Sequence, residues 1–168
     1  CLEPSLYSPR ILKSFLSCLE KDKQTDYPIH IKFNTGLNRL GFWESDVDYI
    51  ISLLKDNKTA KVASIFSHLA ASEDLNEQPF TDTQISNFKS ISKHFISAIG
   101  YKPLMHLCNT SGILNYPEAH LDMVRTGISI YGLHASDNVD KSRINLKPAM
   151  ELKARIIHLK KVPAGFKV

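Results

Sequence analysis

The sequence has few of the features that mark membrane, secreted or metal-binding proteins. No apolar run approaches the ~20 residues that a bilayer helix needs, and the first residues lack the charged-then-apolar pattern of a secretory signal. The three cysteines, Cys1, Cys18 and Cys108, form no close pair, which argues against a disulfide framework or a zinc site. The seven histidines lack the spacing and the cysteine partners that metal sites use. We therefore expect a cytoplasmic protein with no metal and no membrane contact.

A concentrated basic block is also absent. The 21 Lys and Arg against 17 Asp and Glu give a net charge of +4 that is spread along the chain, so nucleic-acid binding is not indicated. Hydrophobic residues make up 43% and charged residues 23%, which is ordinary globular usage. A chain of 168 residues is long enough for one domain with a real core.

Helical and strand patterns alternate along the sequence. Ser8 is a candidate N-cap for a first helix with Pro9 at its first position, and Thr81 with Gln84 fits a capping box for the third helix. The helices are expected at 8–21, 47–54 and 81–99, and the strands at 29–33, 62–66, 104–108 and 121–125. This alternation predicts an α/β fold with a parallel sheet, either an open doubly wound sheet or part of a barrel.

The pattern changes after residue 135. Residues 136–148 are polar, and beyond them Met150, Leu152, Ala154 and Ile156 alternate with charged residues. Such alternation is typical of a strand with one buried face, of a kind not seen earlier in the chain. We expect a domain boundary near residue 140, with one domain over 1–140 and the start of a β domain over 141–168.

Polar side chains follow each expected strand: Arg39, His68, Asn109 with Thr110, and Arg125. In parallel α/β folds the carboxyl ends of the strands form the ligand-binding edge, so these side chains are expected to converge there. Each residue alone has an ordinary alternative: a surface ion pair for Arg39, a hydrogen-bonded core residue for His68, and loop or cap groups for Asn109 and Thr110. A buried Arg125 needs a partner once desolvated.

Four sequence segments resemble those of a known family. They are "IHIKFNTGLNRLGF", "SIFSHLA", "MHLCNTSGILNYPEAHLDMVRTGISIYGL" and "LKPAMELKARIIHLKKVPAGFKV". In order and spacing, the sequence resembles alanine racemases over about residues 29–168. The resemblance implies an eight-stranded TIM barrel that carries pyridoxal 5'-phosphate, a following β domain, and a homodimer whose active sites span both subunits. It implies that this chain holds about four parallel strands, the C-terminal half of the barrel, and the first strand of the β domain.

The resemblance also implies a cofactor site. Phosphate sites in such barrels are commonly formed by the loops after strands seven and eight, which here would hold Asn109–Thr110 and Gly127–Ile128. Thr110 stands where family members usually have serine, which keeps the hydroxyl and adds a methyl group. Arg125 would face the pyridine nitrogen, and because arginine can only donate, that nitrogen would stay unprotonated.

Three further residues take roles from the same resemblance. His68 matches a histidine beside the cofactor ring, and Arg39 matches an arginine that positions the substrate carboxylate. Lys32 matches a lysine that is carbamylated in many relatives, a change that would convert a cation repelling Arg39 into an anion able to pair with it.

The two bases that racemisation needs are not found in this sequence. The Schiff-base lysine is expected upstream of Cys1 and the tyrosine downstream of Val168, so we assign no catalytic residue here and expect no racemisation by this chain alone. The resemblance therefore predicts that this chain is part of an enzyme that interconverts L- and D-alanine for cell-wall synthesis. The alternatives are a non-catalytic pyridoxal-phosphate-binding barrel protein, a related amino-acid decarboxylase, and a purely structural dimerisation module.

Overall fold

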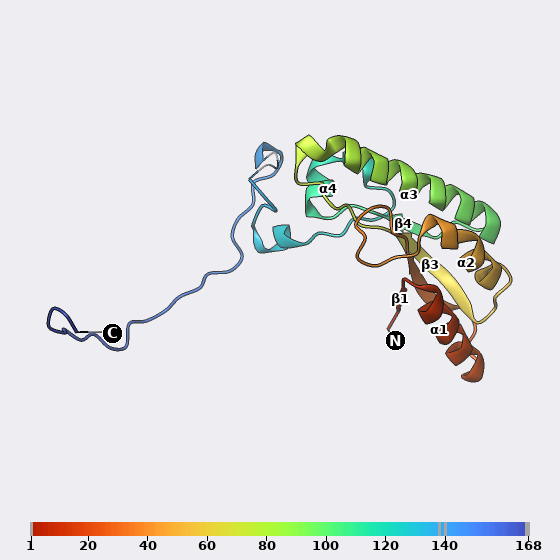
Figure 1. Ribbon diagram of the computed structural model, residues 1–168, viewed down its shortest axis with the longest axis horizontal. Coiled ribbons are helices and arrows are strands. Elements are labelled where there is room, and N and C mark those ends of the chain that lie inside the picture. The colour runs from red at the N-terminus through yellow and green to blue at the C-terminus, as the bar shows by residue number, and fades with distance from the viewer. Residues whose placement is uncertain (1, 138, 140, 167–168) are drawn as a thin grey trace.

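The computed structural model describes residues 2–137, 139 and 141–166. Strands and helices alternate along the chain (Figure 1). The regular elements are β1 (Ser5–Leu6), α1 (Pro9–Lys21), β2 (Tyr27–Lys32), α2 (Val47–Leu54), β3 (Ala60–Phe66), α3 (Gln78–Ile99), β4 (Leu104–His106) and α4 (Thr110–Asn115). Short 3₁₀ turns lie at Glu44–Asp46 (η1), Leu75–Glu77 (η2), Pro117–Ala119 (η3), Ile128–Tyr131 (η4) and Lys141–Arg143 (η5).

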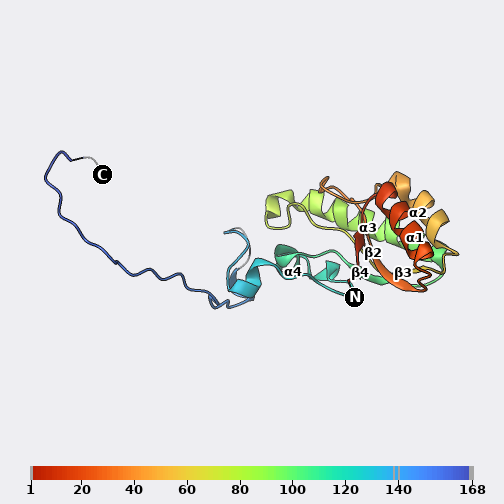
Figure 2. The same ribbon diagram turned by 90° about the horizontal axis from the view of Figure 1, so that it is seen from below.

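The strands form one four-stranded parallel sheet in the order β1-β2-β3-β4. Each strand therefore pairs with the next strand in the sequence, and the order does not reverse anywhere in this sheet. A doubly wound fold reverses its order at a switch point and places helices on both faces. Here α1, α2 and α3 gather on one side of the strands (Figure 2). Of the two α/β alternatives, this arrangement is that of a barrel segment.

The core lies between these helices and the sheet. Isoleucine and phenylalanine side chains of β2 and its extension, Ile29, Ile31 and Phe33, are fully buried. They pack in one cluster with the apolar stripes of the three helices, among them Leu12, Ile50, Phe88 and Phe95. Burial of such side chains contributes about 1.5–3 kcal/mol each, which holds the helices on this face.

The opposite face of the sheet carries polar side chains. His30 and Lys32 alternate with the buried isoleucines of β2, and a bulge in β3 continues the pattern. Ile29 pairs with Val62 but His30 pairs with Ser64, so Ala63 is the extra residue. Bulges commonly redirect side chains in this way. Ser64 therefore lies on the same face as His30, and Phe66 on the same face as Lys32.

Three of the four expected strands are confirmed as β2, β3 and β4, with shifted ends. β1 was not predicted, because a strand of two residues is too short to show an alternation of apolar and polar side chains. The strand expected at 121–125 is wrong: this segment runs beside β4 but forms only an isolated parallel bridge between His106 and Met123. Main-chain hydrogen bonds from Asp122 to Met105 and from Arg125 to Cys108 hold it there.

The helix starts are partly as expected. Ser8 caps α1 by accepting a hydrogen bond from the Ile11 main chain, with Pro9 at the first helical position. The capping box at Thr81 and Gln84 is wrong, because α3 already begins at Gln78 and both side chains are fully buried within the helix. Gln84 instead uses its carboxamide to bind the loop after β3, whereas the Thr81 hydroxyl has no hydrogen-bond partner among the described residues.

The strand expected around 150–156 is also wrong. The described residues 144–166 include no helix or strand, and Leu152 and Ile157 are 100% and 93% exposed. The segment leads away from the sheet (Figures 1 and 2). A lone strand has no neighbour to take its main-chain hydrogen bonds, so the alternating pattern alone cannot form one.

Some expectations fall on residues that the structure does not describe. Cys1, the boundary residue Asp140 and the end of the chain at Val168 lie outside the described residues. Within the described part of the chain, no helix combines the length and the apolar content that crossing a bilayer requires.

Candidate functional site

The candidate site lies beyond the carboxyl ends of β2, β3 and β4. Lys32 and Phe66 end β2 and β3, and His106 ends β4, on adjacent positions of the paired strands. The Phe66 ring stacks on the His106 imidazole with centroids 4.8 Å apart and planes at 9°. The Lys32 Nζ and the Arg125 guanidinium lie 6.0 and 5.3 Å from the centroid of the same phenyl ring. Phe66 is thus the centre around which the charged groups gather.

Arg39 lies on the loop that follows β2. The Asn34 carboxamide shapes this loop by accepting hydrogen bonds from the main-chain N–H groups of Gly36 and Asn38, at 3.2 and 3.0 Å. Gly41 closes the loop at φ 135°, where an added Cβ would lie 2.6 Å from the Asn34 nitrogen. The Arg39 side chain is exposed, and within the described residues it has no hydrogen bond or ion pair.

His68 lies on the loop after β3, which is fixed from both sides. The Gln84 side chain accepts a hydrogen bond from the Ala70 main chain at 2.9 Å and donates to the His68 carbonyl at 3.4 Å. The hydroxyls of Ser67 and Thr35 are 2.8 Å apart and join this loop to the one after β2. Gln84 therefore anchors the histidine loop to α3.

Arg125 is the best-connected residue of the site. Its Nη2 donates to the main-chain carbonyls of Ser67 and Leu107, at 2.6 and 3.2 Å, and lies 3.3 Å from His68 Nδ1. Its Nη1 donates to His106 Nδ1. The guanidinium thus joins the ends of β3 and β4, and His68 and Arg125 are in direct contact.

Positive charge is concentrated at this rim. Burial, and then the nearby Arg39 and Arg125, lower the pKa of Lys32, whose residue is only 9% exposed. Burial, followed by Arg125, Lys32 and Arg39, lowers the pKa of His68 to about 4. Both histidines that touch Arg125 are neutral at pH 7, because burial and then Arg125 also lower the pKa of His106 to about 4.

Thr110 and Gly127 connect the two loops that follow β4. The Gly127 main-chain N–H donates to the Thr110 hydroxyl oxygen at 2.8 Å. The hydroxyl hydrogen of Thr110 is left to donate elsewhere. Gly127 and the following Ile128 are exposed, and Ile128 begins η4.

Asn109 is the N-cap of α4, which is the ordinary role that the sequence offers as an alternative to ligand binding. Its side-chain oxygen accepts hydrogen bonds from the Gly112 main chain at 2.9 Å and from the Ser72 hydroxyl at 2.8 Å, and its amide donates to the Leu69 carbonyl at 3.3 Å. The carboxamide is therefore used in holding α4 against the loop after β3. Asn109 positions Thr110 at the site.

Sequence reasoning missed His106, Ser64 and Gln84. A signal for the first was available, since a histidine inside an otherwise apolar strand needs a polar partner. Ser64 had no such signal, because it meets His30 only through the bulge at Ala63.

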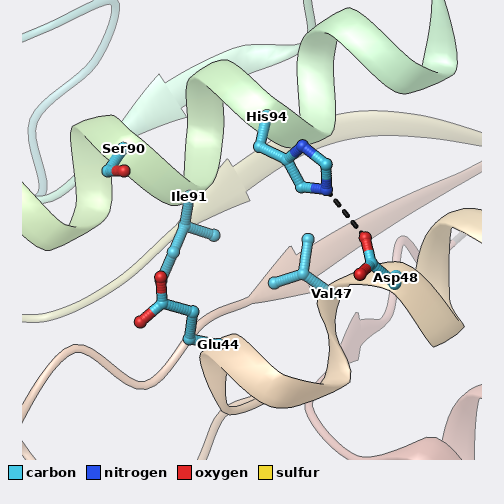
Figure 3. A pocket seen from close by; sticks show the side chains of 6 residues that line it. All are labelled: Glu44, Val47, Asp48, Ser90, Ile91 and His94. Carbon is cyan, nitrogen blue, oxygen red and sulfur yellow. Dashed lines mark hydrogen bonds and ion pairs between the residues drawn. The ribbon is translucent and has the colours of Figure 1, made fainter.

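A separate hollow of about 330 Å³ lies between η1, α2 and α3 (Figure 3). His94 Nε2 and Asp48 Oδ1 are 2.8 Å apart at its side, with 58% and 88% of their side chains exposed. Exposed pairs of this kind contribute little to stability. The lining residues come from helices that cover the outer face of the sheet, so this hollow is distinct from the rim.

Comparison with known proteins gives one consistent result. The family model described as "Alanine racemase, N-terminal domain" matches residues 1–135. The chain is 36% identical over 168 residues to the alanine racemase of Carboxydothermus hydrogenoformans, covering 99% of this chain and 45% of that protein. It is 38% identical over 167 residues to the alanine racemase of Methanococcus maripaludis, covering 98% of this chain and 44% of that protein. The chain spans less than half the length of these curated relatives.

Comparison with solved structures points to the same family. The alanine racemase of Clostridium difficile 630 in complex with cycloserine has a TM-score of 0.85 at 30% identity, with 94% of this chain and 43% of that chain covered. The matched model is the family's N-terminal domain. Residues 1–135 therefore belong to the N-terminal, barrel part of the family and not to a C-terminal portion of it. The chain belongs to the alanine racemase family.

Proposed function

We propose that the whole protein is a pyridoxal-phosphate-dependent alanine racemase and that this chain supplies much of its cofactor site. One observation carries the proposal: three cations, Lys32, Arg39 and Arg125, lie close enough to affect the same His68, and no carboxylate among the described residues contacts any of them. Unbalanced positive charge in a partly buried site favours an anionic ligand.

The donor set fits pyridoxal phosphate and an amino acid. A phosphate dianion needs several hydrogen-bond donors, and the Thr110 hydroxyl with the main-chain N–H groups around Ile128 are available in adjacent loops. Arg125 can only donate, so an aromatic nitrogen facing it must be an unprotonated acceptor. When bound, the cofactor supplies the electrophile that makes the hydrogen on the amino-acid α-carbon acidic.

In this proposal, residues of this chain bind and orient the substrate and the cofactor. Arg39 is free within the described residues to pair with a substrate carboxylate, and neutral His68 lies beside Arg125 without competing for an anion. Asn109 and Gly127 fix the phosphate loop around Thr110. Lys32 lies behind them, where a carbamate would pair with Arg39 and Arg125 instead of repelling them.

We further propose the domain plan that the sequence suggests. Residues 1–140 would be the second half of the barrel and residues 141–168 the connection to a β domain. The sequential parallel order supports a barrel segment over the first part, and the fully exposed Leu152 on an alternating segment supports the second, since that side chain needs a partner sheet. A homodimer with alanine as substrate, producing D-alanine for cell-wall synthesis, belongs to the same proposal.

The test is an assay of the full reading frame. We expect the complete protein, loaded with pyridoxal phosphate, to convert L-alanine to D-alanine, detected with a D-amino-acid oxidase. The same sample with lysine or ornithine should release no CO2. Cofactor absorbance without turnover of either kind would support a non-catalytic binding protein instead, and CO2 release would support a decarboxylase.

A further inference from the structure

We propose that Ser64 is a positioning residue whose hydroxyl transmits a directed hydrogen-bond chain from Arg125 to Glu3: it accepts from His106 and donates to His30, and so keeps the His30 hydrogen on the nitrogen that faces Glu3. The inference rests on the proposed function only in assigning Arg125 to the cofactor. The tautomers themselves follow from the geometry of this chain.

The chain of contacts crosses the polar face of the sheet through five side chains joined by four contacts. Arg125 Nη1 meets His106 Nδ1, and His106 Nε2 lies 3.0 Å from the Ser64 hydroxyl oxygen. The same oxygen lies 2.6 Å from His30 Nδ1. His30 Nε2 lies 3.0 Å from Glu3 Oε2 at the surface.

For two neutral imidazoles, Arg125 and the single hydroxyl hydrogen of Ser64 fix the position of each ring hydrogen. Arg125 can only donate, so His106 Nδ1 must be a bare acceptor, and a neutral His106 then carries its hydrogen on Nε2. That hydrogen points at the Ser64 oxygen, which leaves the single Ser64 hydrogen for His30 Nδ1. His30 consequently carries its hydrogen on Nε2 and donates to the Glu3 carboxylate. All donors point from Arg125 towards Glu3.

Burial leaves no ready substitute for Ser64. Ser64 is 0% exposed and His106 is 5% exposed, so water has little access to the middle of the chain. The stacked Phe66 ring holds the His106 plane. The bulge at Ala63 is what places Ser64 beside His30, because regular pairing would put Ala63 there.

The opposite tautomer of His106 would be costly. A hydrogen on Nδ1 would face the Arg125 donor, and the guanidinium would lose one of its acceptors. A positively charged His106 would face the same cation directly. The Ser64 hydroxyl, by accepting from Nε2, favours the one state that holds Arg125 in place.

Nitrogen-15 NMR of the imidazole rings tests this without any cofactor. We expect His106 and His30 in the native chain to show a bare Nδ1 and a protonated Nε2. In Ser64→Ala, the His30 resonance pair should shift towards mixed tautomers while His106 keeps its bare Nδ1 against Arg125, and Ser64→Thr should restore the native His30 shifts. Ser92→Ala is the matched control, because Ser92 is also 0% exposed but its hydroxyl has no partner.

A protonated Nδ1 on His106 in the native chain would overturn the proposal, and so would an unchanged His30 tautomer in a folded Ser64→Ala. If that variant does not fold, the His106 and His30 tautomers in the spectrum of the native chain still test the proposal. A full-length protein that fails to racemise alanine leaves this result unaffected, so failure of the two proposals can be told apart.

Discussion

Arg125 Nη2 donates to the main-chain carbonyl of Ser67 at 2.6 Å, across 58 residues of sequence. This bond and the one to the Leu107 carbonyl join the loops after β3 and β4. The side chain proposed to face the cofactor therefore also holds the site together. Its replacement should affect both stability and binding.

Arg125→Lys is expected to lower the free energy of unfolding by about 2–4 kcal/mol, because one ammonium cannot replace a planar fork with three acceptors on different elements. Urea unfolding followed by circular dichroism measures this. Arg10→Lys on the exposed side of α1 is the control, expected to change stability by less than ~0.5 kcal/mol. Equal effects of the two variants would contradict the linking role of Arg125.

Stability should fall as the pH falls from about 6.5 to about 4. The pKa of His68 and of His106 is lowered to about 4 in the folded chain, so the unfolded chain binds more protons in this window. Their contribution is fully present above pH 6.5 and is lost towards pH 4, on the order of 1 kcal/mol for each histidine after allowance for solvent screening.

The measurement is urea unfolding at pH 7.5 and at pH 5. His68→Gln and His106→Gln should each reduce the pH dependence. A stability that rises on acidification would show that these histidines are protonated in the native state.

Lys32 is expected to react with CO2. Burial, Arg39 and Arg125 lower the pKa of its ammonium, which increases the neutral amine at a given pH. The amine nitrogen bonds to the carbon of CO2 and loses a proton to water, leaving a carbamate anion beside two arginines. Carbon-13 NMR with labelled bicarbonate should show a carbamate signal that Lys32→Gln abolishes and Lys61→Gln, at an exposed position, retains. A free ammonium at Lys32 in the complete protein would refute this.

Thr110→Val should weaken pyridoxal phosphate binding by the complete protein about tenfold, since it removes one hydroxyl donor and frees the Gly127 loop. Cofactor absorbance in a titration reports the affinity. Thr110→Ser should bind as the parent does. Thr83→Val, which removes an exposed hydroxyl on α3, is the matched control.

Gly41→Ala should destabilise the chain more than Gly100→Ala. Both glycines have positive φ, 135° and 81°, but an added Cβ at Gly41 would collide with the Asn34 main chain whereas that at Gly100 meets nothing within 4 Å. We expect about 1 kcal/mol for Gly100→Ala and about 3 kcal/mol for Gly41→Ala, measured by thermal unfolding. A similar cost for both would mean that the loop carrying Arg39 can adapt.

The local patterns of the sequence determined most of the helices and the strand ends. The stripe of α1 with its Ser8 cap, and the alternation of Ile29 and Ile31 with His30 and Lys32, depend on neighbours within a few residues. Because each strand end of a parallel sheet lies at one edge, the positions of His68 and Asn109 at the rim also followed from the sequence, whereas Arg125 reaches the rim from a segment that is not a strand.

Tertiary structure alone decided which of these groups touch. The strand expected at 121–125 became a single bridge and the one expected at 150–156 became exposed chain, because pairing depends on partners that a pattern does not contain. The Ala63 bulge brought Ser64 to His30 and His106, and Arg125 found its acceptors across the sheet. Side-chain order along the chain is a local property, but hydrogen-bond partners are set by the distances that packing produces.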